Sequence, residues 1–291
     1  MSKSQTTRQY TGQILKQYGL KAKKKYGQNF LCDETVLDGI VLAAGVEKND
    51  SVLEIGPGIG SLTERLLEAA EYVTAVEIDP DMVKILRERF KDYNNLTICN
   101  EDILTLDPTE LMSHTGEGRI KVVANLPYYI TTPILMYLME GELWQYIDSI
   151  TVMVQSEVAR RLVAKPGSRE YGAITLAIDY RCRADIAIEV PAEAFLPAPE
   201  VESAVVVLKR YENPPILLRP KEEKRLFSLI KAAFSVRRKT LVNALSIASY
   251  AGGNKDEIKR AIAAIGVRED VRGEALSLEQ YVRLSEQLNG D

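Results

Sequence analysis

The chain has 291 residues, of which 46% are hydrophobic and 27% are charged, and its formal net charge is −4. This composition is typical of a globular protein with a substantial core, and it excludes disordered and fibrous chains. No apolar run is long enough to span a membrane, and residues 1–25 lack the apolar stretch of a secretory signal, so we expect a cytoplasmic protein without a membrane partner. Three separated cysteines and a single histidine argue against both a disulfide framework and a metal site.

The N-terminal segment is basic although the whole chain is acidic. No Asp or Glu precedes Asp33. We interpret residues 1–20 as a basic leader. We expect Lys23, Lys24 and Lys25 to contact RNA, because phosphate binding responds to the local field rather than to the net charge.

After residue 50, short apolar runs alternate with helical patterns. The runs that predict strands are 51–56, 72–78, 96–99, 121–124 and 150–154, and helical spacing is found at 62–70 and 82–90. This alternation predicts βαβ units that form a parallel sheet with helices on both faces.

The pattern then changes. Two β-rich runs, 174–180 and 204–208, are joined by a proline-rich segment, which predicts an antiparallel hairpin that closes the sheet. Beyond Pro214 the helical segments are 222–234, 240–250, 255–265 and 278–288, the last capped by Ser277. We therefore expect an α/β domain over 21–212, with a mostly parallel sheet and an antiparallel last strand, and a smaller all-α domain over 213–291.

A glycine-rich turn follows the first predicted strand. Glycines at 56, 58 and 60 would let the backbone pass close to a ligand at a helix N-terminus. A dinucleotide fingerprint would require a third glycine where this chain has Ser61. A G-x-G-x-G turn after a strand that carries an acid is instead typical of enzymes that use S-adenosyl-L-methionine, so we expect Gly56 and Gly58 to bind that cofactor.

Acidic residues follow the next two strands. Glu77, with Ile78 beside it, ends the second strand, where a carboxylate can accept hydrogen bonds from ribose hydroxyls. Asp102 follows the third strand and could hold an adenine amino group, with Ile103 covering the ring. Either acid could instead be a helix cap, as we expect for Asp79, but ligands bind at the carboxyl ends of such strands.

The segment after the fourth strand indicates the chemistry. An adenine N6 amine is a poor nucleophile, and two acceptors, the Asn125 side-chain oxygen and the Leu126 carbonyl, would localise its lone pair. Pro127 would fix the backbone, and Tyr128 would offer a face on which an extruded base can stack. No strong base is required, so catalysis would depend on alignment and on those two acceptors.

Together these motifs carry a family resemblance. The segments are Lys25–Leu31, Gly56–Gly60, Asn125–Tyr128, Phe195–Pro199 and Phe234–Leu241. They resemble the rRNA adenine N6-dimethyltransferases, and most closely the bacterial small-subunit branch, the RsmA/KsgA family. The likeness runs from about Lys25 to the C-terminus; the leader is longer than expected, and Glu200 stands where many relatives carry Lys.

The resemblance implies a Rossmann-like methyltransferase domain with a helical C-terminal domain. Nothing in the sequence suggests an oligomer, so we expect a monomer. Its substrate would be two adjacent adenosines in the hairpin loop near the 3′ end of 16S rRNA, in the small ribosomal subunit or its precursor, and each N6 would receive two methyl groups. Cofactor contacts are implied for Gln28, Asn29, Leu31, Gly56, Glu77, Asp102 and Asn125. Phe195 would stack on the target base opposite Tyr128.

Further basic clusters suit a large, shaped RNA, although a solvated helix face is their usual meaning. We predict RNA contacts for Arg160, Arg161, Lys165, Arg237, Arg238 and Lys239.

Four other functions remain open. The sister branch of the family acts on large-subunit rRNA and confers macrolide resistance. The sequences of residues 125–128 and 234–241, together with the long helical tail, favour the small-subunit branch instead. A DNA adenine methyltransferase usually has Pro where this chain has Leu126, and Ser61 argues against a nicotinamide oxidoreductase. A role chiefly in ribosome assembly is compatible with methylation, and Glu77→Ala would separate the two by abolishing transfer while sparing subunit binding.

Overall fold

The computed structural model describes residues 6–19, 28–115, 118–127, 129–236 and 238–288. The chain divides into two compact units, one of residues 1–159 and 185–210 and the other of residues 160–184 and 211–291. The second unit therefore begins close to the boundary predicted after residue 212 but also includes an earlier segment. That segment belongs there because Tyr171, Leu176 and Tyr180 pack in the same core as the C-terminal helices.

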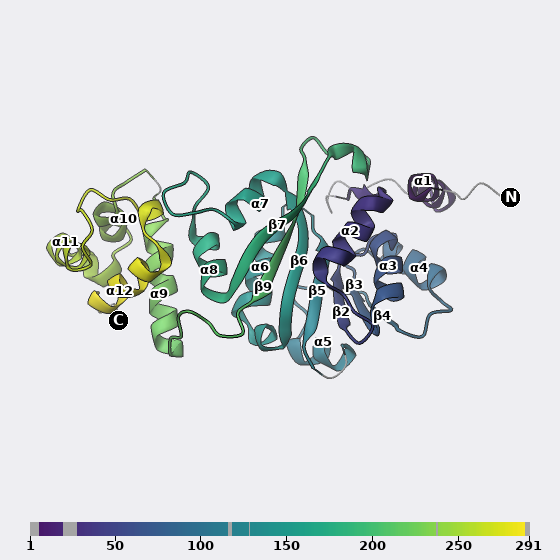
Figure 1. The fold of residues 1–291 in the computed structure, drawn as a ribbon, viewed down its shortest axis with the longest axis horizontal. Coiled ribbons are helices and arrows are strands. Elements are labelled where there is room, and N and C mark those ends of the chain that lie inside the picture. The colour runs from purple at the N-terminus through teal and green to yellow at the C-terminus, as the bar shows by residue number, and fades with distance from the viewer. Residues whose placement is uncertain (1–5, 20–27, 116–117, 128, 237, 289–291) are drawn as a thin grey trace. The chain divides into compact units, whose positions relative to one another are not determined.

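The first unit is built on a sheet of seven strands in the order β4-β3-β2-β5-β6-β9-β7 (Figure 1). The strands are β2 (Ser51–Ile55), β3 (Tyr72–Val76), β4 (Leu96–Cys99), β5 (Ile120–Asn125), β6 (Ile147–Gln155), β7 (Cys182–Val190) and β9 (Ser203–Arg210). Five strands, β4 to β6 in this order, are parallel, and β9 runs antiparallel to β6. These findings confirm the predicted mostly parallel sheet with an antiparallel last strand.

The order of the strands locates a binding crevice. From β2 the chain moves outward to β3 and β4, and it then returns to place β5 on the other side of β2. Ligands in open α/β sheets bind outside the carboxyl ends of the strands at such a reversal. The carboxyl ends of β2 and β5 carry the glycine turn and Asn125, so the topology brings these two predicted motifs together.

Helices complete the first unit. They are α1 (Thr7–Gln17), α2 (Glu34–Ala44), α3 (Ser61–Ala69), α4 (Pro80–Arg89), α5 (Pro108–His114), α6 (Thr131–Glu140) and α7 (Ser156–Leu162), the last crossing into the second unit. Leu37 and Ile40 of α2 and Leu66 of α3 share one core cluster with Val123 of β5 and Val205 of β9, so α2 and α3 cover one face of the sheet. Asp79 caps α4 by accepting from the Asp81 N–H at 3.1 Å, as predicted.

A short second ladder lies beside the main sheet. Strands β1 (Phe30–Leu31) and β8 (Phe195–Leu196) pair antiparallel, with Phe30 opposite Leu196 and Leu31 opposite Phe195. Sequence patterns do not reveal strands of this length, because two residues carry no periodicity.

The predicted strand at 174–180 is wrong. These residues lie in helix α8 (Ala173–Arg181), and strand β7 follows it directly. Leu176, Ala177 and Ile178 are all buried, and a short helix that is apolar all round has the same composition as a buried strand. By contrast, β7 is mostly exposed and stands at the edge of the sheet, where charged side chains are common.

The second unit is helical. Besides α8 it contains α9 (Pro220–Ala233), α10 (Leu241–Ile247), α11 (Lys255–Ala264) and α12 (Leu278–Gln287), which confirm the predicted helices with small shifts at their ends. Arg181 is buried, pairs with Glu223 at 2.6 Å and lies against the rings of Tyr180 and Phe227. Ser277 caps α12, as predicted. No helix in the described ranges is long and apolar enough to cross a membrane.

Candidate active site

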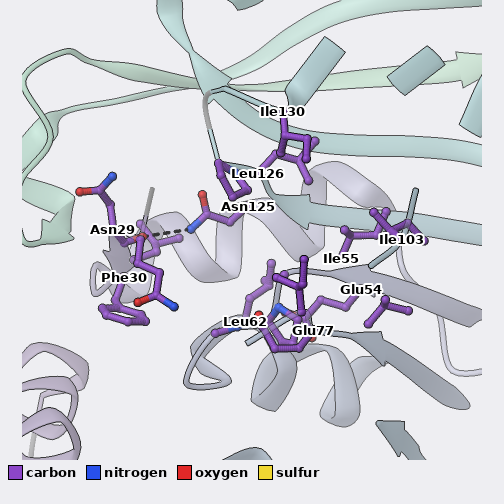
Figure 2. A pocket seen from close by; sticks show the side chains of 18 of the residues that line it. Asn29, Phe30, Glu54, Ile55, Leu62, Glu77, Ile103, Asn125, Leu126 and Ile130 are labelled. Atoms are coloured by element: carbon purple, nitrogen blue, oxygen red, sulfur yellow. Dashed lines mark hydrogen bonds between the residues drawn. The ribbon is translucent and has the colours of Figure 1, made fainter. Parts of the chain in front are cut away.

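A pocket opens at the carboxyl ends of β2, β3 and β5 (Figure 2). The predicted residues that line it are Gln28, Asn29, Leu31, Gly56, Gly58, Glu77, Ile78, Asp102, Ile103, Asn125, Leu126, Pro127 and Phe195. The structure thus brings together all the residues expected to bind the cofactor and four of those expected to act in catalysis. Tyr128 lies outside the described residues.

The glycine turn after β2 has a backbone that other residues adopt only with strain. The φ angles of Gly56, Gly58 and Gly60 are +69°, +58° and +86°. A Cβ on Gly60 would lie 2.5 Å from a ring carbon of Phe90, so glycine is required there by space as well as by conformation. The turn therefore passes the pocket with no side chain at Gly56 and Gly58, while Pro57 and Ile59 between and after them line the pocket.

Glu77 is fixed at the end of β3 by backbone donors. Its carboxylate accepts from the Gly58 N–H at 3.0 Å and from the Asp79 N–H at 2.9 Å. Burial raises the pKa of Glu77, and these two N–H groups oppose that shift. The carboxylate is therefore anchored on the glycine turn and is oriented before any ligand arrives.

Glu54 is a second acid in the pocket, and the sequence marked it only as an acid in the first strand. Its side chain is 1% exposed, and among the described residues its Oε2 atom has no hydrogen-bond partner. Burial raises the pKa of Glu54 to about 8; the Thr63 hydroxyl opposes this shift, and the nearby charge of Glu77 adds to it. A buried carboxyl oxygen without a hydrogen bond is costly, and a cation bound in the pocket would favour the ionised form of Glu54.

Asn125 is oriented by the segment that leads into β1. Its amide nitrogen donates to the Asn29 carbonyl at 3.5 Å, and its amide oxygen is turned away from that contact (Figure 2). Leu126 donates its N–H to the Met153 carbonyl at 3.3 Å, and the Pro127 carbonyl accepts from the Ile130 N–H at 3.2 Å. These two backbone hydrogen bonds fix the segment that follows β5, one at Leu126 and the other at Pro127.

Asp102 and Phe195 lie in the pocket wall, the first just after β4 and the second on β8. Asp102 accepts from the Leu104 N–H at 3.0 Å, so it shapes the turn after β4 and also lines the pocket. Phe195 is 1% exposed and lies in the pocket wall on β8. Its stacking role stays a prediction.

Sequence reasoning missed several apolar residues of the wall. They are Phe30, Leu37, Leu62, Tyr129, Ile130 and Ile134. Phe30, Tyr129 and Ile130 lie within or next to motifs recognised in the sequence, so their position beside those motifs could have predicted that they line the pocket. Leu37 and Ile134 belong to apolar helical stripes, and such a stripe looks the same whether it faces a core or a ligand.

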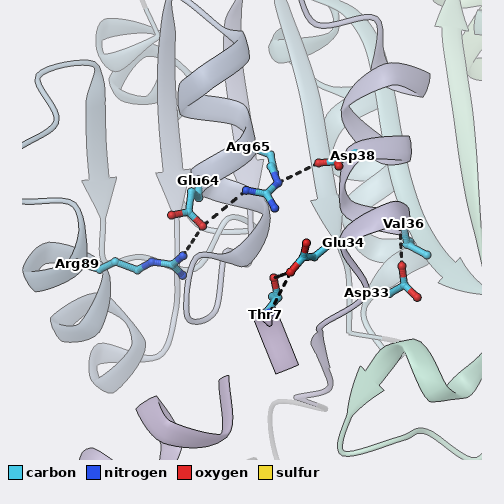
Figure 3. A network of polar contacts seen from close by, with 8 residues as sticks. All are labelled: Thr7, Asp33, Glu34, Val36, Asp38, Glu64, Arg65 and Arg89. Carbon is cyan, nitrogen blue, oxygen red and sulfur yellow. Dashed lines mark hydrogen bonds and ion pairs between the residues drawn. The ribbon is translucent and has the colours of Figure 1, made fainter. Parts of the chain in front are cut away.

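A polar network braces the helices behind the glycine turn (Figure 3). Arg89 of α4 donates to the Ile59 carbonyl at 2.9 Å and pairs with Glu64 of α3 at 2.6 Å. Arg65 then pairs with Asp38 of α2 at 2.9 Å. The turn is therefore tied to α4 through its own backbone.

The predicted RNA contacts are placed only in part. Arg160, Lys165, Arg238 and Lys239 are exposed, Arg161 is half-buried, and all of them belong to the second unit. Lys23, Lys24, Lys25 and Arg237 lie outside the described residues. Their contact with RNA stays a prediction.

Comparisons with known proteins agree with one another. A family model described as ribosomal RNA adenine dimethylase matches residues 19–290. A protein named ribosomal RNA small subunit methyltransferase A from Lachnoclostridium phytofermentans is 47% identical, over 95% of this chain and 94% of the relative. One of the same name from Leuconostoc citreum is 46% identical, over 96% of this chain and 94% of the relative.

Two solved structures have the same fold. The 23S rRNA methyltransferase ErmE superposes with a TM-score of 0.68 at 28% identity, covering 90% of this chain and 100% of that one. A dimethyladenosine transferase from Plasmodium falciparum superposes with a TM-score of 0.70, covering 88% of this chain and 95% of that one. At 24% identity, the second supports the fold alone.

Proposed function

Because the chain belongs to the ribosomal RNA adenine dimethylase family, we propose that it dimethylates adenine N6 in 16S rRNA of the small ribosomal subunit, with S-adenosyl-L-methionine as the methyl donor. The substrate is the pair of adjacent adenosines in the hairpin loop near the 3′ end, methylated during subunit assembly. One observation carries the proposal: a single pocket gathers Glu77 and Asp102 at strand ends and faces them with Asn125, Leu126 and Pro127. The enzyme works as a monomer in the cytoplasm, where this substrate is found.

The chemistry of the pocket fits the cofactor. When bound, S-adenosyl-L-methionine supplies a methyl group on a positively charged sulfur. Glu77 is the acceptor for the ribose hydroxyls and Asp102 for the adenine amino group, with Gly56 and Gly58 allowing close approach of the backbone. The buried carboxyl of Glu54, whose Oε2 atom has no hydrogen-bond partner among the described residues, fits a cationic ligand, since it gains a counter-charge when that ligand enters. Gln28, Asn29 and Leu31 close the pocket from the β1 side.

The other wall acts on the target base. The Asn125 oxygen and the Leu126 carbonyl accept hydrogen bonds from the N6 amine and so localise its lone pair. Support comes from the Asn125 amide nitrogen, whose bond to Asn29 keeps the oxygen pointing the other way. Tyr128 and Phe195 stack on the extruded base, and the exposed cations of the second unit contact RNA phosphates. The released proton passes to water, so no general base is needed.

Small-subunit rRNA is favoured over large-subunit rRNA by the comparisons. The two relatives named as small-subunit enzymes are 46–47% identical to this chain over nearly its whole length, whereas the 23S enzyme is 28% identical.

The test is transfer of labelled methyl groups to small subunits isolated from cells that lack the modification, with large subunits as the parallel substrate. We expect dimethyladenosine in small-subunit RNA alone and its loss with Asn125→Ala. The matched control is Asn94→Ala, which removes an exposed asparagine that does not line the pocket and should leave transfer unchanged.

Label in large-subunit RNA alone would assign the chain to the other branch. Cofactor binding without transfer to either subunit would mean that the proposed substrate is wrong.

A further inference from the structure

The β1–β8 ladder forms a wall of the pocket but has little means of holding itself together. It consists of two residues in each strand, yet Asn29, Phe30, Leu31 and Phe195, on or next to it, all line the pocket. An isolated two-stranded ladder is marginal in water even at greater length. Leu31 and Phe195 pack into the core of the sheet, but Phe30 and Leu196, on the other side of the ladder, belong to a separate cluster, and that side needs another element to cover it.

Helix α1, in the segment that the sequence marked only as a basic leader, contacts the β8 side of the ladder. The Arg8 guanidinium donates to the carbonyl oxygens of Glu193 and Phe195, the latter at 3.2 Å. These are main-chain acceptors at β8 and just before it. Arg8 therefore fixes the backbone of the strand that carries Phe195, whereas an RNA-binding arginine would point toward solvent.

The same helix also contacts β1. Thr11 is fully buried, and its hydroxyl accepts from the Cys32 thiol at 3.5 Å. Ile14, Leu15 and Tyr18 pack against a cluster that contains Phe30 and Ile59. One face of α1 thus covers both strands of the ladder and one residue of the glycine turn.

Two polar contacts anchor the ends of α1 on neighbouring helices. Thr7 donates to the Glu34 carboxylate of α2 through its N–H at 3.2 Å and its hydroxyl at 3.1 Å (Figure 3). Tyr18 donates its hydroxyl to Glu88 of α4. In addition, the Arg89 guanidinium, which binds the glycine turn, lies 4.7 Å from the ring centre of Tyr10. The helix is therefore attached to the parts of the unit that frame the pocket.

We propose that α1 is a positioning element of the cofactor site: it clamps the β1–β8 ladder, with Arg8 as the residue that ties it to the strand bearing Phe195. Binding of S-adenosyl-L-methionine and docking of α1 support each other, because both stabilise the same wall and such coupling is reciprocal. The inference rests on the proposed cofactor site and adds to it a role for a segment outside the recognised motifs.

The first test measures the Kd for S-adenosyl-L-methionine by calorimetry on the full chain. Arg8→Ala should raise it about three- to tenfold, as expected for one charge-assisted hydrogen-bonding group on a partly exposed helix. Thr11→Val, which removes the buried hydroxyl at nearly constant volume, should raise it in the same direction. The matched control is Lys16→Ala, which removes a cation from an exposed position of the same helix and should leave the Kd unchanged.

The second test follows alkylation of Cys32, which α1 covers, by mass spectrometry. Arg8→Ala should speed the reaction, S-adenosyl-L-methionine should slow it, and buried Cys182, at the start of strand β7, serves as the internal standard. A purely global loss of stability would speed both cysteines together and would overturn the inference.

The outcomes separate this inference from the proposed function. If the unaltered chain does not bind S-adenosyl-L-methionine, the proposed function fails. If it binds and Arg8→Ala leaves the Kd unchanged, or Lys16→Ala weakens binding equally, only the clamp is refuted. Equal loss of RNA binding in Arg8→Ala and Lys16→Ala, with the Kd for the cofactor unchanged, would make α1 an RNA-contacting leader.

Discussion

Glu54 should make the stability of the protein depend on pH, and Glu54→Gln should remove that dependence. The side chain is buried, and its pKa is raised from 4.5 to about 8 in the folded chain. In the unfolded chain the carboxyl titrates near its usual value. Between these two values the folded chain therefore holds a proton that the unfolded chain has released.

The sign and the size follow from this difference. Stability falls as pH rises through the window from 4.5 to about 8, and the curve is flat below and above it. Each pH unit inside the window costs up to about 1.4 kcal/mol, so the whole window costs at most about 5 kcal/mol. Because the group is buried, no discount for solvent screening applies, but structural relaxation makes this an upper bound.

Urea unfolding of the unaltered chain and of Glu54→Gln, followed between pH 5 and 9 without cofactor, measures the effect. The glutamine keeps the shape and removes the titration, so the difference between the two free energies of unfolding isolates Glu54 from the other groups. Up to about pH 8 the unaltered chain should lose about 1 kcal/mol per pH unit relative to the variant, and above that pH the difference should stay constant. Glu101→Gln, which removes an exposed carboxyl from the same pocket, controls for the loss of a charge there.

A difference that stays constant across this range would refute the reasoning. It would mean that water, or the Thr63 hydroxyl beside it, stabilises the Glu54 carboxylate enough to cancel the effect of burial in the folded chain.

Gly60→Ala tests the packing of the first unit, with Gly45→Ala as its control, and Tyr281→Phe tests the packing of the second unit. Gly60→Ala should lower the free energy of unfolding by about 2–4 kcal/mol, because it adds a Cβ 2.5 Å from Phe90 at a φ of +86°. Gly45→Ala, at a φ of +58° with nothing within 4 Å of the new Cβ, should cost only about 1 kcal/mol in the same denaturation assay, and equal losses would contradict the steric argument. Tyr281→Phe should cost about 1–2 kcal/mol, since it removes a buried hydroxyl that donates to the Gly273 carbonyl at 2.9 Å; an unchanged thermal midpoint would show that this bond contributes nothing.

The residues that local sequence placed at the ends of strands lie around one pocket in the structure, while their roles stay predictions. The glycine turn, Glu77, Asp102 and Asn125 each stand at the end of a strand, and a parallel sheet brings successive strand ends to one edge. Their presence in one pocket is therefore a consequence of strand order, which the alternating pattern indicates. Helices such as α4, α9 and α12 were also predictable, because amphipathic periodicity and capping residues are local signals.

Tertiary structure alone decided the remaining features, because each depends on residues far apart in the chain. The run at 174–180 is a helix since its apolar residues are packed on several sides in the core of the second unit, and composition does not distinguish that environment from a sheet interior. Leu31 pairs with Phe195 although more than half the length of the chain separates them in sequence. No local sequence pattern therefore predicts the ladder that they form. The docking of α1 through Arg8 and the burial of Glu54 are likewise settled by what surrounds a residue, and the surroundings exist only once the chain has folded.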